Sequence, residues 1–143
     1  MIISTPQLTP IKSSADIAAI MDAIYAARPE EDAHREMFYA VALDSRNRII
    51  VIELVTIGSI TQCMPVVREC FRLAVMRDAV AIIVAHNHPS GETRPSPEDN
   101  TYTRKLVMAG GVLGIRVLDH IIVGTGAENK KYYSFADDMN MPV

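Results

Sequence analysis

Apolar residues recur at helical spacing near the start of the chain, and this pattern predicts the first helix. They fall at i, i+3, i+4, i+7 and i+8, which places them along one side of a helix. Ser13 precedes them as a suitable N-cap, and Asp16 makes the first turn acidic. Arg28 stands before Pro29, where the helix is expected to stop. The apolar positions are Ile17, Ile20, Met21, Ile24 and Tyr25.

The later apolar runs are short and predict strands. Residues 80–85 are uninterrupted and rich in β-branched side chains, which is typical of a strand buried on both faces. Residues 44–47 are turn formers, so the runs on either side of them form a hairpin. The predicted strands are residues 36–43, 48–58, 80–85, 115–123 and 131–135.

Two further helices are predicted, at residues 65–77 and 97–109, and Gly110-Gly111 is expected to end the second. The order is therefore α-β-β-α-β-α-β-β, with no internal repeat. This order predicts an α/β fold, a compact single-domain mixed sheet flanked by helices. The predicted division is an N-terminal arm at residues 1–12, one domain at 13–136 and a C-terminal tail at 137–143.

A polar motif follows the buried run at residues 80–85. Side chains alternate along a strand, so His86 and His88 point the same way. Ser96 is a good N-cap for the next helix, and Asp99 falls in that helix's first turn. The intervening loop is long enough to bring the helix start over the histidines. Two nitrogens and a carboxylate oxygen with an open fourth position form the ligand set of a catalytic zinc site.

Each half of this motif also has a simpler interpretation. Residues 96–99 form a helix start with an acidic first turn, which needs no metal. Two histidines in a strand are often only hydrogen-bonded polar residues. The combination of both halves favours the metal interpretation.

The motif resembles that of the JAMM (MPN+) zinc hydrolases in its RadC variant. The chain departs from that pattern at residues 92–94, where an Asp-Pro pair usually follows Ser-Gly. The resemblance covers most of the chain from about Ser13 onward. It is carried by residues 86–91 (His-Asn-His-Pro-Ser-Gly) and 95–99 (Pro-Ser-Pro-Glu-Asp), with further matches at 35–38, 65–69, 103–106 and 114–124.

The resemblance implies a fold, a cofactor and a set of roles. It implies the compact JAMM/MPN architecture and a Zn²⁺ ion held by His86, His88 and Asp99. It implies that Glu36 is the general base and that Ser96 donates a hydrogen bond to the oxyanion. The reaction that it implies is hydrolysis of an amide or isopeptide bond, with a peptide or protein as substrate.

The residues themselves leave three glutamates open as the base. Glu36 begins a predicted strand, and glutamate suits the role when a partly apolar site raises its pKa. Glu53 interrupts an apolar strand, where a buried carboxylate is costly unless it is paired. Glu69 lies beside Arg68 in a predicted helix, which is typical of a surface or salt-bridge residue.

Two further histidines are weaker candidates. His120, next to Asp119 on a predicted strand, is either a hydrogen-bonded core histidine or a residue that orients a metal ligand. His34 shares a strand face with Glu36 if that strand starts early, so it is a further possible ligand.

Composition narrows the function classes. The chain has 143 residues and a net charge of −3, and dedicated nucleic-acid binders usually have a basic balance. The two cysteines, Cys63 and Cys70, are too few for a disulfide framework, and Cys70 fits a buried helix side. No stretch reaches membrane-spanning length and no signal peptide is recognised, so we expect a reduced, cytoplasmic setting.

Two other functions compete with the hydrolase. RadC proteins are commonly described as DNA-repair or mobile-element accessory proteins, but the chain is acidic and is expected to lack that family's N-terminal helix-hairpin-helix region. The other alternative is an interaction module without turnover, either metal-binding or metal-free, and the complete set of three ligands argues against the metal-free form. The sequence predicts neither the substrate nor the oligomeric state.

Overall fold

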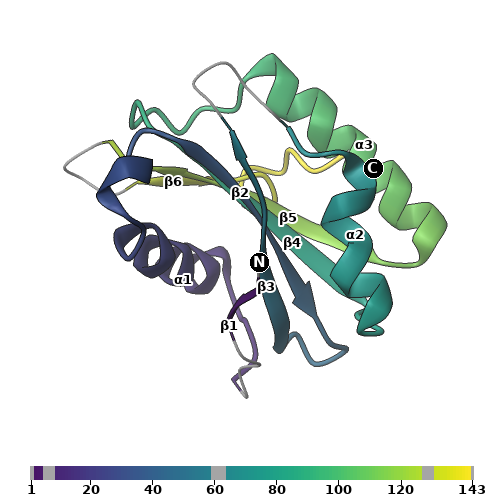
Figure 1. Cartoon of the computed structure of the whole chain (residues 1–143). Coiled ribbons are helices and arrows are strands. Elements are labelled where there is room, and N and C mark those ends of the chain that lie inside the picture. Colours follow the sequence, from purple (N-terminus) through teal and green to yellow (C-terminus); the bar gives the residue numbers. More distant parts are fainter. Residues whose placement is uncertain (1, 5–8, 59–63, 127–130, 143) are drawn as a thin grey trace.

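A mixed β-sheet forms the centre of the molecule (Figure 1). The computed structural model describes residues 2–4, 9–58, 64–126 and 131–142, so Cys63 lies outside the described residues. Within them the sheet has six strands in the order β1-β3-β2-β4-β5-β6, and only the pairing of β4 with β5 is parallel. The strands are β1 (Ile2–Ser4), β2 (Glu36–Leu43), β3 (Ile49–Gly58), β4 (Ala81–His88), β5 (Arg116–Gly124) and β6 (Tyr132–Ser134).

Helices cover both faces of the sheet (Figure 1). Helix α1 (Ser14–Ala26) packs on one face, and α2 (Val67–Met76) and α3 (Pro97–Leu113) pack on the other. A short 3₁₀ helix, η1 (Glu30–Asp32), leads into β2. The strands alternate between two apolar clusters, as the period of a β-strand requires. Odd-numbered apolar residues of β2 and β4 belong to the cluster that includes α1, and even-numbered ones such as Phe38 and Ile82 belong to the cluster that includes α2 and α3. The predicted α/β class is confirmed.

One strand was absent from the predicted order. The N-terminal arm contains β1, whose Ile2 and Ser4 pair with Glu53 and Ile52 of β3. Without β1, β3 would be an edge strand with unpaired backbone groups. A strand of three residues shows no readable alternation, so the sequence pattern does not reveal it.

The prediction that Gly110-Gly111 ends the third helix is wrong. Helix α3 continues to Leu113, and Gly114 caps it in the left-handed conformation with φ 72°. Gly110 is instead a point of close approach, because a Cβ there would lie 2.3 Å from the carbonyl oxygen of Ile115. The glycine therefore permits packing of the helix against the chain that enters β5.

Strand β4 is longer than predicted, and this extension positions the polar motif. It runs to His88 instead of ending at Ala85, and it pairs with β5 as far as His88 and Gly124. Both histidines are thus held in the sheet and not in a loop. Both bounds of β2 agree with the prediction, the other boundaries lie within two residues of the predicted ones, and α2 starts at Val67. Among the described residues, no helix combines the length and apolar content needed to cross a bilayer.

Candidate metal centre

Strand β4 presents two imidazoles to the face covered by α2 and α3. His86 lies between Phe38 of β2 and Ile122 of β5, and it is 1% exposed. The Phe38 ring stacks on the His86 ring with centroids 5.6 Å apart. His88, at the end of the strand, is only partly buried. The His86 imidazole is therefore enclosed by its neighbours, whereas the His88 imidazole is partly accessible to solvent.

The start of α3 brings a carboxylate to these histidines. The Ser96 N–H donates to Oδ2 of Asp99 at 2.8 Å, and the Asp99 N–H donates to Oγ of Ser96 at 3.0 Å. This reciprocal capping box fixes both the helix start and the carboxylate. Asp99 is 3% exposed. Its Oδ1 lies 3.2 Å from Nε2 of His86, and its Oδ2 lies 3.3 Å from Nε2 of His88.

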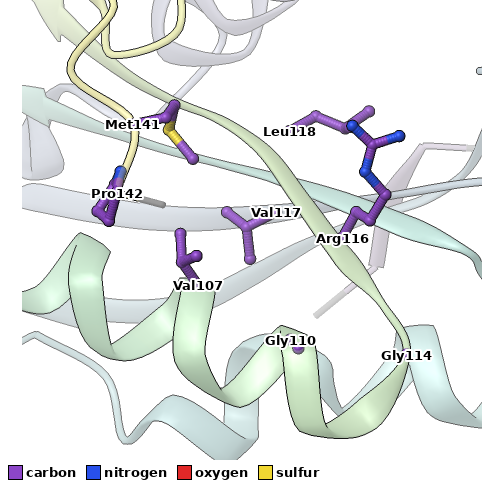
Figure 2. Close-up of a pocket in the computed structure, with 9 residues that line it drawn as sticks. Val107, Gly110, Gly114, Arg116, Val117, Leu118, Met141 and Pro142 are labelled. Atoms are coloured by element: carbon purple, nitrogen blue, oxygen red, sulfur yellow. The ribbon is translucent and has the colours of Figure 1, made fainter.

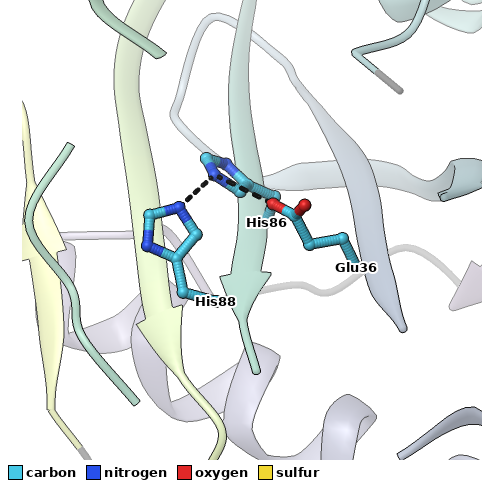
Figure 3. A group of neighbouring side chains, drawn as sticks. All are labelled: Glu36, His86 and His88. Carbon is cyan, nitrogen blue, oxygen red and sulfur yellow. Dashed lines mark hydrogen bonds and ion pairs between the residues drawn. The ribbon is translucent and has the colours of Figure 1, made fainter. Parts of the chain in front are cut away.

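Glu36, at the first position of β2, completes the polar group. Glu36, His86 and His88 each have a ligand atom within 4.8 Å of the others', so they form a group that can hold a metal ion. In Figure 3 the carboxylate and the two imidazoles face one another. Oε1 of Glu36 lies 3.9 Å from Nε2 of His86. This separation is too long for a hydrogen bond.

The spacing of these atoms fits a tetrahedral ion. With zinc–ligand bonds of ~2.0–2.1 Å, neighbouring ligand atoms lie about 3.3 Å apart. The two Nε2 atoms are 3.1 Å apart, and Asp99 contacts them at 3.2 and 3.3 Å. The 3.2 Å contact is made by Oδ1 of Asp99 and the 3.3 Å contact by Oδ2, so the carboxylate spans the two imidazoles, and Glu36 lies farther out.

The orientation of His88 also fits a cation. Its Nδ1 lies 2.8 Å from the backbone carbonyl oxygen of Glu92, and a carbonyl oxygen can only accept. Nδ1 therefore carries a proton and donates. In the neutral imidazole Nε2 then presents a lone pair towards the Asp99 carboxylate. A proton on Nε2 makes the hydrogen bond to Asp99, and a metal ion can take the place of that proton.

Burial and hydrogen bonds shift the pKa values of these polar groups in different directions. Burial would raise the pKa of the Asp99 carboxyl, but hydrogen bonds with His86 and His88 outweigh it and hold the pKa well below its usual range. Burial acts to lower the pKa of His88, yet its bonds to Asp99 and the Glu92 backbone raise it above the ordinary value. Burial, reinforced by the nearby His86, lowers the pKa of His120 well below its usual value. His120 is therefore neutral near pH 7.

A buried amide on the opposite face of the sheet positions Glu36. Asn87, which is 0% exposed, accepts from the Met37 N–H at 2.7 Å and donates to the Arg35 carbonyl oxygen at 3.0 Å. Its amide also donates to Oγ1 of Thr125. The pairing of β2 with β4 ends at Phe38, so the Asn87 side chain replaces the ladder bonds beyond that point. Asn87 therefore fixes the backbone of both neighbours of Glu36, namely Arg35 and Met37.

The other candidates lie in different surroundings. Glu53 pairs with Arg72 of α2, and β2 separates its strand from the histidines. Glu69 lies in the first turn of α2, and His34 is exposed in a turn before β2. The Asp119 carboxylate accepts from Ser134 and from the backbone of His120 and Ala136, so its role is structural. The His120 ring contacts the His86 ring directly.

Two residues of this region were missed as candidates, Asn87 and Thr103. Asn87 had a usable signal, because a polar amide inside an apolar strand must find hydrogen-bond partners. Thr103 had none, since a threonine in a helix has many ordinary roles. Both act through hydrogen bonds to segments far away in the sequence.

A cavity elsewhere in the molecule carries no such chemistry. A cavity of about 500 Å³ lies between the second half of α3, β5 and the chain near Met141 (Figure 2). Its described lining contains one charged side chain, Arg116, and no histidine, cysteine or carboxylate. The candidate metal ligands are gathered instead at the other end of α3.

Comparison with known proteins identifies relatives of this chain. The model of the RadC-like JAB domain family matches residues 11–141. A UPF0758 protein of Caldanaerobacter subterraneus subsp. tengcongensis is 47% identical over 105 residues, which cover 71% of this chain and 45% of the relative. A UPF0758 protein of Chloroflexus aggregans is 44% identical over 125 residues, with coverage of 86% and 52%. The chain thus spans about half the length of these relatives, whose names state no activity.

Proposed function

We propose that this chain, which belongs to the RadC-like JAB domain family, is a zinc-dependent hydrolase that cleaves an amide or isopeptide bond in a peptide or protein. The observation that carries the proposal is the cluster of His86, His88 and Asp99, whose ring nitrogens lie 3.1 Å apart and contact the carboxylate at 3.2 and 3.3 Å, with Glu36 beside it. The resemblance of the surrounding motif to the JAMM zinc hydrolases supports the choice of bond.

The proposed ligands are Nε2 of His86, Nε2 of His88 and the Asp99 carboxylate. Two nitrogens and one oxygen leave a fourth position open, as catalytic zinc sites do. Zinc held there would lower the pKa of a water molecule towards neutrality and polarise a carbonyl group. The capping box of α3 holds Asp99 in place for this task.

Glu36 is the proposed general base. Its side chain is 26% exposed, so it lies at the boundary between the buried histidines and solvent, where a substrate can reach it. The carboxylate would take a proton from the attacking water and later deliver it to the leaving amine. Asn87 keeps the backbone on both sides of Glu36 in position for this transfer.

Ser96 is the proposed oxyanion donor. Its hydroxyl oxygen accepts from the Asp99 N–H, a contact that uses a lone pair and not the hydroxyl proton. The proton can therefore donate to the negative charge that develops on the carbonyl oxygen of the substrate. One hydroxyl thus serves both as helix cap and as transition-state donor.

Elemental analysis tests the metal assignment. We expect purified protein to carry about one zinc per chain, held by three protein ligands. His88→Ala should lose most of it, whereas His34→Ala, which removes an exposed histidine outside the group, should keep it. Equal zinc in wild type and His88→Ala would overturn the assignment.

A substrate screen tests the reaction. Peptides, isopeptide-linked proteins, single-stranded DNA and duplex DNA would be incubated with the zinc-loaded protein, with Glu36→Gln as the inactive control. Cleavage of an amide or isopeptide bond by wild type alone is the expected result. Cleavage of DNA and of no peptide would refute the proposed substrate class.

A further inference from the structure

Two buried polar side chains beside the histidines have no role in the chemistry proposed above. Thr103 of α3 and His120 of β5 are each 0% exposed. The His120 ring stacks on Phe135 with centroids 5.0 Å apart and meets the edge of Phe38 at 5.9 Å. Both of its ring nitrogens nevertheless have a polar partner, Thr103 on one side and His86 on the other.

The direction of these hydrogen bonds follows from one fixed acceptor. The Thr103 hydroxyl donates to the backbone carbonyl oxygen of Asp99 at 2.7 Å, because a carbonyl cannot donate. A hydroxyl has a single proton, so Thr103 must accept in its 2.6 Å contact with Nδ1 of His120. Nδ1 of His120 therefore carries the proton of this buried imidazole.

The same reasoning extends to the metal centre. With its proton on Nδ1, the neutral His120 ring offers Nε2 as an acceptor. Nε2 lies 2.8 Å from Nδ1 of His86, which must then donate. His86 consequently has its proton on Nδ1 and a bare Nε2, and Nε2 is the atom that faces Asp99 and His88.

We propose that Thr103 and His120 are positioning residues that fix the tautomer of His86 and keep its Nε2 free to bind metal. The inference rests on the proposed zinc site. The path starts at the backbone of Asp99 and ends at the ring of His86, so it also ties two of the three proposed ligands together across α3, β5 and β4. The Glu92 carbonyl does the same for His88, but from a loop at the rim.

A single isosteric substitution breaks the path. Thr103→Val keeps the shape of the side chain and removes the hydroxyl, so nothing then decides which nitrogen of His120 is protonated. Thr103→Ser restores a hydroxyl. Thr101→Val is the matched control, because it makes the same change at an exposed position of the same helix.

Two measurements on these proteins need no substrate. The ¹⁵N chemical shifts of the imidazoles in the zinc-free protein report which ring nitrogen is protonated. We expect wild type, Thr103→Ser and Thr101→Val to have the His86 proton on Nδ1, and Thr103→Val to show a mixture. Competition with a chelator should find zinc binding about 10–100-fold weaker in Thr103→Val, the usual effect of losing a partner behind a ligand, and recovered in Thr103→Ser.

His120→Gln is a second, independent variant, since an amide can accept from His86 and donate to Thr103. It should keep zinc affinity within a few-fold of wild type, whereas His120→Leu should lose 10–100-fold, as in Thr103→Val. A wild-type His86 with its proton on Nε2, or a folded Thr103→Val that binds zinc as tightly as wild type, would overturn the inference. The two proposals can fail separately. If the variants show these differences in zinc affinity but the zinc-loaded wild type cleaves no amide bond, the proposed hydrolase activity is refuted and the positioning role of Thr103 and His120 is supported.

Discussion

Two buried carboxylates on the same face of the sheet have opposite surroundings. Glu53 of β3 and Asp99 of α3 are almost equally enclosed, with side chains 3% and 4% exposed. Glu53 meets the guanidinium of Arg72, so one negative charge meets one positive charge. Asp99 meets two histidine nitrogens, and Glu36 adds a second carboxylate nearby.

The difference shows that burial of a carboxylate does not by itself identify a functional site. The Glu53 pair is complete, because Arg72 supplies the cation that the desolvated carboxylate needs. At the histidine cluster two carboxylates, Asp99 and Glu36, meet imidazoles, so the positive charge must come from a bound proton or a metal ion. The useful criterion is therefore whether the partner of a buried charge is already present in the chain.

The largest expected effect is on turnover, and it contrasts a glutamate of the histidine cluster with the paired Glu53. Glu36→Gln should keep zinc and lower turnover by ~10²–10⁴-fold, because an amide of nearly the same size cannot take a proton. Glu53→Gln is the matched control and should leave turnover close to wild type. Steady-state rates on the substrate found by screening provide the measurement. The reverse result, an active Glu36→Gln and an inactive Glu53→Gln, would identify Glu53 of β3 as the general base.

The second prediction concerns Cys70, which lies on the same helix as Arg72. Burial raises the pKa of its thiol to about 12, and the nearby Glu53 carboxylate acts in the same direction. At pH 8 the thiolate should be about 10³-fold scarcer than in the unfolded chain. Ellman's reagent should therefore label Cys63→Ser protein only in denaturant, and rapid labelling of the folded protein would contradict this.

The same shift has a consequence for stability. A thiol whose pKa is higher in the folded state contributes stability below the unfolded value, and that contribution is lost as pH rises through the folded value of about 12. Cys70→Ala in the same Cys63→Ser background should reduce the loss of stability above pH 9. Urea unfolding at pH 8 and pH 10 measures the difference.

The third prediction separates the two proposed roles of Ser96. As an oxyanion donor, its loss should lower kcat by about 10²-fold with little change in KM, since the bond forms only in the transition state. Ser96→Ala should also lower the free energy of unfolding by ~0.5–2 kcal/mol, whereas Ser96→Gly should change it by only a few tenths. Zinc should remain in both, because the backbone N–H of residue 96 still contacts Asp99. A fully active Ser96→Gly would reduce Ser96 to a helix cap.

The smallest expected effect is on the free energy of unfolding, and it tests the ion pair of Glu53 with Arg72. Arg72→Met leaves Glu53 buried without its partner, which should cost ~1–3 kcal/mol of unfolding free energy. Arg68→Met, an exposed change on the same helix, should cost less, and the double variant Glu53→Leu with Arg72→Met should recover much of the loss. Urea unfolding of the three variants measures these differences, and zinc content should not change in any of them.

Local patterns were enough to predict most of the fold. The apolar side of α1, the hairpin of β2 and β3, and the buried run in β4 depend on spacing within a few residues, so they can be read from the chain. The errors have physical causes of another kind. Gly110 suggested a helix end, but the structure uses it for close contact with Ile115, and the three residues of β1 are specified by the open edge of β3.

The sequence by itself determined the polar motif, because His86 and His88 are two residues apart in one strand and Ser96 and Asp99 are three apart at one helix start. Only the tertiary structure decided which residues distant in the sequence contact this motif. It placed Glu36 beside His86, 50 residues away in the sequence, and it placed the Asn87 amide where it accepts a hydrogen bond from the backbone of β2. It also placed Arg72 against Glu53. Such meetings depend on strand register and helix packing, which arise when distant segments bury their apolar faces together.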